Sequence, residues 1–314
     1  MRVLVTGGLG FIGSNATRAL LKSNDVELTV IDDLSIGQPA DLCEGGYELI
    51  EGSILNKSLV AKLVGSHDCV LHFAADTRVL DSIVDPEYNY SVNVEGTLNI
   101  LNSMRNSNCK KIVFASTGGA IGGDIKPPLN EEIVPRPISP YGASKLCGEG
   151  YLNAYGANYG IDATSLRFSN VYGPYSYRKG SVVASFMKSI LRGEGKLTIN
   201  GDGMQSRDFV YIDDLVNAIT FCVNNSTSGV YQLGSGVETT VLELVDTLKE
   251  VIGDTMFPEL EFGPKLTGEV DRNYSDISKA RKELQFEPTF LLKDGLRITW
   301  DWFLKNRESL KLVA

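Results

Sequence analysis

The stretch that decides the fold is Val3-Leu-Val-Thr-Gly-Gly-Leu-Gly-Phe-Ile-Gly13, at the start of a chain of 314 residues. A short strand-forming run leads directly into glycines at positions 7, 10 and 13. Glycines in this pattern let a turn tighten, let backbone N–H groups approach a pyrophosphate and let the next helix pack closely on the sheet. The stretch therefore predicts a strand, a phosphate-binding turn and a helix whose positive dipole end faces the phosphates.

The acidic residue that follows this unit indicates which dinucleotide the turn binds. The next predicted strand ends at Asp32, about 20 residues further on, where a carboxylate can bind both ribose hydroxyls of NAD. NADP would place a phosphate against Asp32, and no arginine occurs at positions 33–38 to receive that phosphate. The sequence therefore favours NAD.

Short apolar runs alternate with amphipathic segments through the first half of the chain, which is typical of a parallel sheet. The expected strands are 3–6, 27–31, 47–50, 69–72, 112–115 and 163–167, and the expected helices are 11–21, 57–64, 86–104 and 140–159. The alternation stops near residue 167, but the segment 208–233 resembles another strand-helix-strand unit that returns to the first sheet. We predict an α/β fold: a Rossmann-type doubly wound parallel sheet in residues 1–167 and about 204–235, with a smaller C-terminal α/β substrate-binding domain in about 168–203 and 236–314.

Composition excludes several classes of protein. The chain has 30 Lys and Arg against 39 Asp and Glu, a net charge of −9, and no long basic run, so we expect no nucleic-acid partner. The longest apolar runs, of about five residues, fall far short of the roughly 20 that a membrane helix needs, so we expect no membrane partner. The chain enters its first strand at once, which leaves no room for a targeting segment.

Cysteine and histidine usage narrows the compartment and the chemistry. Five widely spaced cysteines disfavour a disulfide framework and predict a cytoplasmic protein. The two histidines and the absence of a Cys-x-x-Cys pair argue against a metal site. A Ser-His-Asp hydrolase is also disfavoured, because His72 ends an apolar run and is expected to be a buried structural residue.

A tyrosine and a lysine supply the first candidate chemistry. Tyr141 and Lys145 are four residues apart in a predicted helix, so both side chains lie on one face. A nearby ammonium and a positive nicotinamide ring both favour the phenolate, which makes Tyr141 a usable base near neutral pH. The pair follows the fifth predicted strand, whose end carries Ser116 and Thr117 at the edge where open sheets bind ligands.

With these features the chain resembles the extended short-chain dehydrogenases/reductases of the NAD-dependent sugar epimerase/dehydratase family, above all the UDP-glucose 4-epimerase branch. The similar motifs are Thr6-Gly-Gly-Leu-Gly-Phe-Ile-Gly13, Val30-Ile-Asp-Asp-Leu34, His72-Phe-Ala-Ala75, Asn93-Val-Glu-Gly-Thr97, Ser116-Thr117, Tyr141-Gly-Ala-Ser-Lys145, Arg167-Phe-Ser-Asn-Val-Tyr-Gly-Pro174, Gly201-Asp-Gly203, Arg207-Asp-Phe-Val-Tyr-Ile-Asp-Asp214 and Gly268-Glu-Val-Asp-Arg-Asn-Tyr-Ser-Asp276.

The resemblance implies a role for each matching position. Tyr141 would be the catalytic base, Lys145 would hold the nicotinamide ribose, and Thr117 would hydrogen-bond the reacting sugar hydroxyl. The cofactor-binding positions would be Gly7, Gly10, Phe11, Ile12, Gly13, Asp32, Asp33, Ser53, Ile54, Phe73, Ala74, Ala75, Asn93, Tyr141 and Lys145. The substrate-binding positions would be Ser116, Thr117, Gly118, Asn170, Val183, Arg207 and Arg272. A homodimer formed through helices 86–104 and 140–159 is also implied.

The residues after Thr117 separate the reactions of the family. Family dehydratases carry an Asp-Glu pair there, which moves the C5 proton and the C6 hydroxyl, whereas this chain has Gly118-Gly119. The sequence therefore predicts a nucleotide-sugar 4-epimerase that oxidises C4 transiently with tightly bound NAD, on UDP-glucose/UDP-galactose or UDP-GlcNAc/UDP-GalNAc. The alternative is another NAD-dependent nucleotide-sugar enzyme: a 4,6- or 5,6-dehydratase, a uronate epimerase or a decarboxylase.

The chain departs from the family pattern at three places, of which the first concerns the contact with adenine and the other two the sugar pocket. Gly52-Ser53-Ile54 replaces a stretch that often carries Asp, and Gly122 stands where a tyrosine is usual. Asn273 aligns with the gate for bulky C2 substituents, so an N-acetyl group is expected to fit.

Overall fold

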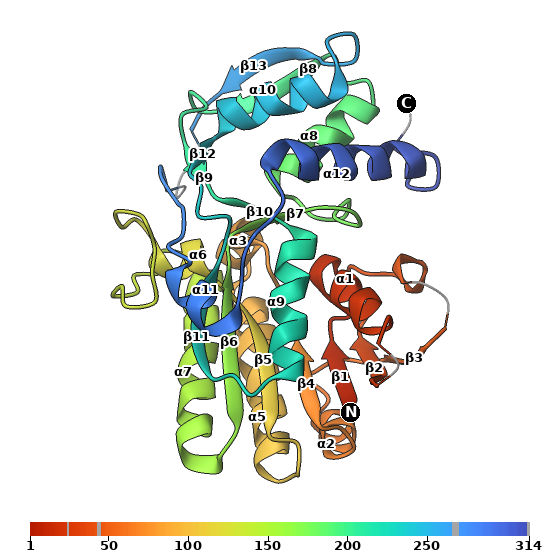
Figure 1. Cartoon of the computed structure of the whole chain (residues 1–314), viewed down its shortest axis with the longest axis vertical. Coiled ribbons are helices and arrows are strands. Elements are labelled where there is room, and N and C mark those ends of the chain that lie inside the picture. The colour runs from red at the N-terminus through yellow and green to blue at the C-terminus, as the bar shows by residue number, and fades with distance from the viewer. Residues whose placement is uncertain (24, 43–44, 266–269, 313–314) are drawn as a thin grey trace.

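The computed structural model describes all residues except 24, 43–44, 266–269 and 313–314 (Figure 1). Its centre is a seven-stranded sheet in the order β11-β6-β5-β4-β1-β2-β3, and all neighbouring strands run parallel. The strands are β1 (Arg2–Thr6), β2 (Glu27–Asp32), β3 (Tyr47–Glu51), β4 (Cys69–His72), β5 (Lys111–Thr117), β6 (Asp162–Phe168) and β11 (Gly229–Leu233). The strand order reverses between β1 and β4, which is where doubly wound sheets open a ligand crevice.

Helices cover both faces of this sheet. One face carries α1 (Phe11–Leu20) and α9 (Ile212–Asn224), which contact each other. The opposite face carries α2 (Lys57–Gly65), α5 (Gly96–Arg105) and α7 (Pro140–Tyr159), which pack in a row (Figure 1). The expected helix 86–104 is α4 (Pro86–Tyr90), a π-helical turn η2 (Ser91–Glu95) and α5 in continuous succession.

The strands are buried on both sides, as the continuous apolar runs predict. Neighbouring residues of β1 divide between two cores: Val3 and Val5 pack in the cluster that includes α1 and α9, while Leu4 packs in the cluster that includes α2 and α5. The same alternation separates Val113 from Phe114 on β5. Side chains of a strand point to opposite faces in turn, so each strand holds both helix layers.

The six strands and four helices predicted for the first half are confirmed, with small shifts at their ends. The prediction that 230–233 returns to the first sheet is also confirmed, because β11 pairs with β6. The preceding segment behaves differently, since β10 (Phe209–Tyr211) pairs with β7 (Asn170–Tyr172) and not with the large sheet. Two short helices, α3 (Val79–Val84) and α6 (Gly118–Gly122), have no counterpart in the prediction.

Two-stranded sheets of short strands occur in the second half. In Figure 1 they lie above the carboxyl ends of the large sheet. The pairs are β8 (Lys196–Asn200) with β13 (Glu259–Gly263), and β9 (Ser206–Arg207) with β12 (Thr239–Thr240). The remaining helices are η1 (Pro39–Asp41), α8 (Val182–Leu191), α10 (Val241–Ile252), α11 (Ser278–Leu284) and α12 (Leu292–Asn306).

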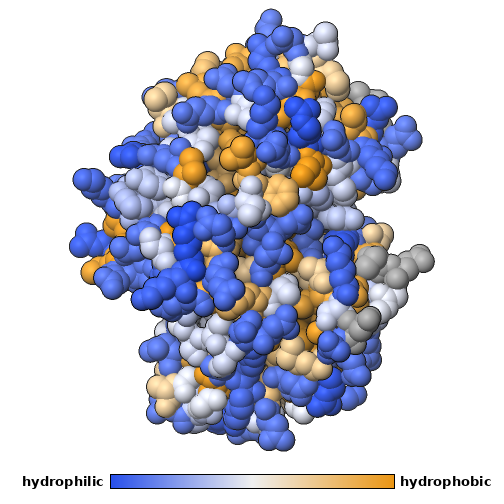
Figure 2. Space-filling view, in the orientation of Figure 1, coloured by the Kyte–Doolittle hydropathy of each residue, from blue (hydrophilic) through white to orange (hydrophobic). Residues whose placement is uncertain are grey.

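Within the described ranges, none of the helices has the length and apolar character needed to cross a membrane. The visible face is a mosaic of hydrophilic and hydrophobic residues (Figure 2). Among the described cysteines, Cys69, Cys109, Cys147 and Cys222 are free thiols, and Cys43 lies outside the described residues.

Candidate active site

The glycine turn forms a cradle between β1 and α1. Gly7 has φ +66°, a left-handed conformation that glycine adopts without strain. A Cβ on Gly7 would lie 2.6 Å from the backbone nitrogen of Ala74, and a Cβ on Gly13 would collide with the carbonyl oxygen of Gly7. The turn closes with a 3.1 Å hydrogen bond from the Gly10 N–H to the Gly7 carbonyl, and α1 begins at Phe11. This backbone cradle at a helix N-terminus fits the pyrophosphate of a dinucleotide.

Asp32 ties the turn to the end of β2. Its carboxylate is 8% exposed and accepts backbone hydrogen bonds from Leu9 and Leu34, both at 3.0 Å. Burial raises the pKa of Asp32 above its ordinary value, while these two hydrogen bonds lower it. Each carboxylate oxygen keeps a further lone pair, so the side chain can accept ribose hydroxyls while it holds the turn.

His72 has the structural role that the sequence predicts. Its ring is buried, with Nδ1 2.8 Å from Thr6 Oγ1 and Nε2 2.9 Å from Thr97 Oγ1. Burial lowers the pKa of His72 to about 3, so the ring is neutral. Phe73 and Ala74 follow immediately and donate backbone hydrogen bonds to Thr6, which holds the end of β4 against the glycine turn.

Asn93 lies in the π-helical turn η2 and connects three segments. Its side-chain amide donates to the Ser144 hydroxyl at 3.0 Å and to the Asp76 carbonyl at 2.9 Å, and its oxygen accepts the Asp76 N–H at 2.8 Å. A π-turn widens a helix locally and is frequent at functional sites. Here it fixes the loop after β4 against the first turns of α7.

The three predicted catalytic residues meet at the carboxyl end of β5. Helix α7 begins at Pro140, and the hydroxyl of the preceding Ser139 caps it by accepting the Gly142 N–H. The phenol of Tyr141 hydrogen-bonds with the Thr117 hydroxyl. One turn later Lys145 donates to the Ala115 carbonyl at 3.0 Å, and its ammonium lies 4.8 Å from the centre of the Phe114 ring. The structure therefore brings Thr117, Tyr141 and Lys145 together.

Burial dominates the electrostatics of this group. It raises the pKa of Tyr141 to about 12, outweighing the hydrogen bond with Thr117 that lowers it. Burial also lowers the pKa of Lys145 to about 7. Both shifts arise because a charge is costly away from water. Asp76, a carboxylate absent from the predicted site, raises the pKa values of both Tyr141 and Lys145.

The Gly118-Gly119 pair is covered by two amide side chains. A Cβ on Gly118 would lie 2.5 Å from Oε1 of the buried Gln232, and a Cβ on Gly119 would collide with Nδ2 of Asn273. Side chains as large as Asp and Glu therefore require Gln232 and Asn273 to move. Neither amide can serve as a general acid or base near neutral pH.

Ser116 does not join the catalytic group. Its hydroxyl donates to Oε1 of Glu149 at 2.6 Å, on the α7 side of the sheet, because adjacent residues of a strand face opposite sides. Glu149 also accepts two hydrogen bonds from Arg167, at 2.9 and 2.8 Å. The sequence could have indicated Glu149, since it lies four residues beyond Lys145 on the same helix face.

The second half contributes an arginine pair. Arg207 lies on β9, and its neighbour Ser206 forms an isolated bridge with Arg272. Arg272 donates to both oxygens of Glu238, each at 2.7 Å, and this pairing holds the pKa of Glu238 near 2. Glu238 was not predicted as a site residue. Gly268 and Glu269 of the predicted motif lie outside the described residues.

The buried carboxylate of Asp208 holds these loops in place. It accepts hydrogen bonds from the Ser235 N–H and hydroxyl and from the N–H groups of Gly236 and Ser275. The Asp208 carbonyl accepts the N–H of Asn170, which places this predicted substrate residue beside β9. Through its side chain and its backbone carbonyl, Asp208 thus joins the segments that carry Asn170, Glu238 and Arg272.

Several predicted positions have other local roles. Ser53 accepts the Leu55 N–H, Asp33 accepts the Ser35 N–H, and Ile54 is buried. Val183, predicted to contact substrate, is 1% exposed, and its side chain packs in the hydrophobic core with other residues of α8.

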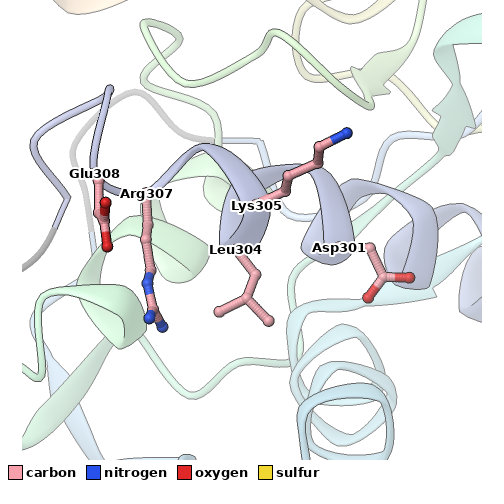
Figure 3. Close-up of a pocket in the computed structure, with 5 residues that line it drawn as sticks. All are labelled: Asp301, Leu304, Lys305, Arg307 and Glu308. Carbon is pink, nitrogen blue, oxygen red and sulfur yellow. The ribbon is translucent and has the colours of Figure 1, made fainter.

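A depression elsewhere on the surface is separate from this site. It is lined by residues of α12 and the turn after it, and Figure 3 shows Asp301, Leu304, Lys305, Arg307 and Glu308. None of these residues belongs to the predicted site.

Comparison with known proteins identifies a matching family model. The model of the NAD dependent epimerase/dehydratase family matches residues 3–234. The chain is 37% identical to a UDP-glucose 4-epimerase from Thermotoga maritima, solved with UDP-glucose, with a TM-score of 0.92 over 98% of this chain and 99% of that one.

Relatives with other reactions are also similar. A UDP-glucuronic acid 4-epimerase from Bacillus cereus, solved with UDP-glucuronic acid and NAD, is 31% identical, with a TM-score of 0.89 over 97% of this chain and 99% of that one. A dTDP-glucose 4,6-dehydratase from Streptomyces niveus is 32% identical over 98% of this chain and 94% of its own length.

Proposed function

The chain belongs to the NAD-dependent epimerase/dehydratase family, with NAD as its cofactor, and we propose that it is a 4-epimerase of a UDP-hexose. UDP-glucose/UDP-galactose and UDP-GlcNAc/UDP-GalNAc are the proposed substrate pairs. The similarity to a UDP-glucose 4-epimerase over nearly the whole chain supports this choice.

The observation that carries the proposal is the Gly118-Gly119 pair under Gln232 and Asn273. A 4,6-dehydratase must remove a proton from C5 and protonate the leaving C6 hydroxyl, which requires an acid and a base beside the threonine. Glycine supplies neither, and the space beside it is occupied by amides that do not titrate. Epimerisation at C4 needs only one base.

The proposed chemistry uses the three residues at the end of β5. Thr117 hydrogen-bonds the C4 hydroxyl and orients it toward Tyr141, which accepts its proton as the C4 hydride leaves. NAD, held at the turn of Gly7, Gly10 and Gly13 and by Asp32, would supply a reversible hydride acceptor for C4, which allows the hydride to return to the other face of the sugar. Tyr141 then returns its proton to the C4 oxygen, so the enzyme and NAD finish unchanged and the cofactor can stay bound.

Tyr141 must ionise at a pH far below its ligand-free pKa of about 12. A protonated Lys145 one turn away and the positive nicotinamide both favour the phenolate. Buried in the same pocket, Lys145 exerts a stronger field than an exposed lysine would, because the local dielectric is low.

We assign the UDP portion to the second half of the chain. Arg207 and Arg272 would bind the diphosphate, since a guanidinium offers two parallel donors to phosphate oxygens. Asn170 would bind the same part of the substrate. The Glu238 pairing leaves Nη1 of Arg272 without a bond to that carboxylate, so this nitrogen is the one that can turn to a phosphate.

We also propose a homodimer formed through α4 to α5 and α7, in the cytoplasm. Tyr88 and Tyr90 on α4 and Tyr151 and Tyr159 on α7 are 39–54% exposed, an aromatic enrichment that suits an interface. We propose further that residues 1–167 and about 204–235 form the NAD-binding domain, and that about 168–203 and 236–314 form the nucleotide-sugar-binding domain. Light scattering on an eluted peak tests the dimer, and a monomer mass would contradict it.

Proton NMR of the purified protein, without added NAD, tests the reaction. Incubation with UDP-glucose, UDP-GlcNAc and UDP-glucuronate in turn should give new anomeric signals of a 4-epimer with one or both of the first two. Tyr141→Phe should abolish turnover while NAD stays bound, and Tyr151→Phe on the same helix serves as the matched control. A 4-keto, 5,6-ene or pentose product would contradict the argument from Gly118 and Gly119.

A further inference from the structure

Beneath Lys145 lies a buried group of charges that the proposed reaction does not use directly. Glu149, Arg167 and Ser116 are 6%, 4% and 3% exposed, and Lys145 is 3% exposed. Tyr141, Lys145 and Glu149 follow one another at intervals of four on α7, so they form one column along the helix.

Arg167 and Ser116 hold Glu149 by three hydrogen bonds, at 2.9, 2.8 and 2.6 Å. The Lys145 ammonium, one helical turn from Glu149, donates instead to the Ala115 carbonyl of β5. Glu149 therefore forms no hydrogen bond that would move the Lys145 ammonium along the helix and away from Tyr141. It still acts on Lys145 through space, where water does not screen the charges.

Buried ion pairs are expensive to assemble, and they are weak evidence for stability alone. Nη1 of Arg167 has no hydrogen-bond partner, so this pair is not optimised as a structural network. Its position one turn from Lys145 and two turns from Tyr141 gives it a different consequence. When Tyr141 and Lys145 share a single proton, a negative charge nearer to Lys145 favours the proton on the lysine and leaves the tyrosine as phenolate.

We propose that Glu149, fixed by Arg167 and Ser116, is a positioning residue that keeps Lys145 protonated and directed toward Tyr141. This inference rests on the proposed function for the roles of Tyr141 and Lys145. It assigns no contact with substrate or cofactor to Glu149.

Other groups around the ammonium are consistent with this role. Asp76, from the loop after β4, adds a second negative charge, and the neutral His72 on β4 adds none. The positive charge of Arg167 on β6, which binds the Glu149 carboxylate, opposes protonation of Lys145. The Phe114 ring on β5 weakly favours the charged ammonium of Lys145. Burial lowers the pKa of Lys145 to about 7, and Glu149 raises it against that effect more than Asp76 does.

The test measures the titration midpoint of Lys145 by NMR, in holoenzyme that carries isotope-labelled lysine. The Lys145 signal is assigned as the one that is lost in Lys145→Met. Glu149→Gln keeps the shape and removes the charge, so the Lys145 midpoint should fall by roughly one pH unit. At neutral pH the protonated fraction of Lys145 would then fall about fivefold, so turnover should fall by about the same factor with KM little changed. Asp214→Asn neutralises a buried carboxylate that binds Thr289 and Phe290 instead, and it should leave the midpoint unchanged.

Glu149→Gln leaves the Arg167 charge unpaired, so a second variant covers the case in which the protein fails to fold. Glu149→Gln/Arg167→Gln removes both charges, and the midpoint should still fall, by less, because the nearer charge dominates. An unmoved midpoint in a folded variant would overturn the inference. If instead the Lys145 midpoint falls as expected in Glu149→Gln but the wild-type protein epimerises no UDP-sugar, the proposed function is refuted and the inference about Glu149 stands.

Discussion

Replacing Gly7 by alanine tests the cradle that we assign to the cofactor. Gly7 adopts φ +66°, where an L-residue is strained by about 1–2 kcal/mol. The new Cβ would also lie 2.6 Å from the nitrogen and 2.7 Å from the Cα of Ala74, which are backbone atoms of a chain segment fixed to Thr6. Overpacking of this kind costs about 1–3 kcal/mol. Together the two effects should lower the free energy of unfolding by about 2–5 kcal/mol.

Two other glycines separate these contributions. Gly160, at the end of α7, has φ +63° and open space around its Cβ position, so Gly160→Ala should show the backbone strain alone. Gly65 in α2 has neither feature, and Gly65→Ala should be neutral or stabilising by up to about 1 kcal/mol.

Urea unfolding of the three variants measures the energies, and nucleotide released by acid gives the NAD content. Gly7→Ala should lose NAD during purification, because the turn that presents its N–H groups must open, whereas Gly160→Ala should keep a full complement. The reasoning is refuted if Gly7→Ala costs no more than Gly160→Ala and retains its NAD.

Three further predictions follow from the site. Lys145→Met should abolish turnover yet raise the free energy of unfolding. Because the pKa of Lys145 is about 7 in the folded chain and 10.5 in the unfolded chain, this gain should be largest below pH 7 and vanish by about pH 10.5. Urea melts at several pH values measure the gain, and a gain that does not vary with pH would contradict the prediction. Gly119→Ala should reduce kcat because Asn273 must swing away, and Gly119→Ala/Asn273→Ala should restore it; strictly additive losses in this double-mutant cycle would disprove the contact. Glu238→Gln should remove the stability that the Arg272 pair contributes above about pH 4.5 and loses as the pH falls toward 2. Because the pair is exposed, the difference should be small, and equal stability of the two proteins at neutral pH in urea melts would argue against it.

Local residue patterns were sufficient to predict the first half of the fold. The run from Val3 to Gly13 predicts β1, the turn and α1, because strand burial, glycine spacing and helix periodicity are properties of adjacent residues. The helix over 140–159 has the predicted bounds, since Ser139 and Pro140 favour its start and Gly160 its end. Helix α6 over Gly118–Gly122 was missed because glycine has low helix propensity and only its surroundings favour this turn.

The candidate site likewise has features that the sequence predicts and features that it does not. Tyr141 and Lys145 are recognisable at a spacing of four, and the tertiary structure places Thr117 beside Tyr141. The state of that tyrosine was not predictable, because its pKa depends on burial and on Asp76, which a separate loop supplies.

The sequence by itself determined the strands, the glycine turn, the tyrosine-lysine pair and the lack of an acid or base after Thr117, because each depends on which residues are neighbours along the chain. Only the tertiary structure decided that Gln232 and Asn273 cover the glycine pair, that Glu238 holds Arg272 and that Arg167 holds Glu149. These partners come from segments far apart in the chain. Their contacts, and the desolvation that shifts the pKa values of Tyr141 and Lys145, exist only once the sheet and its two helix layers exclude water.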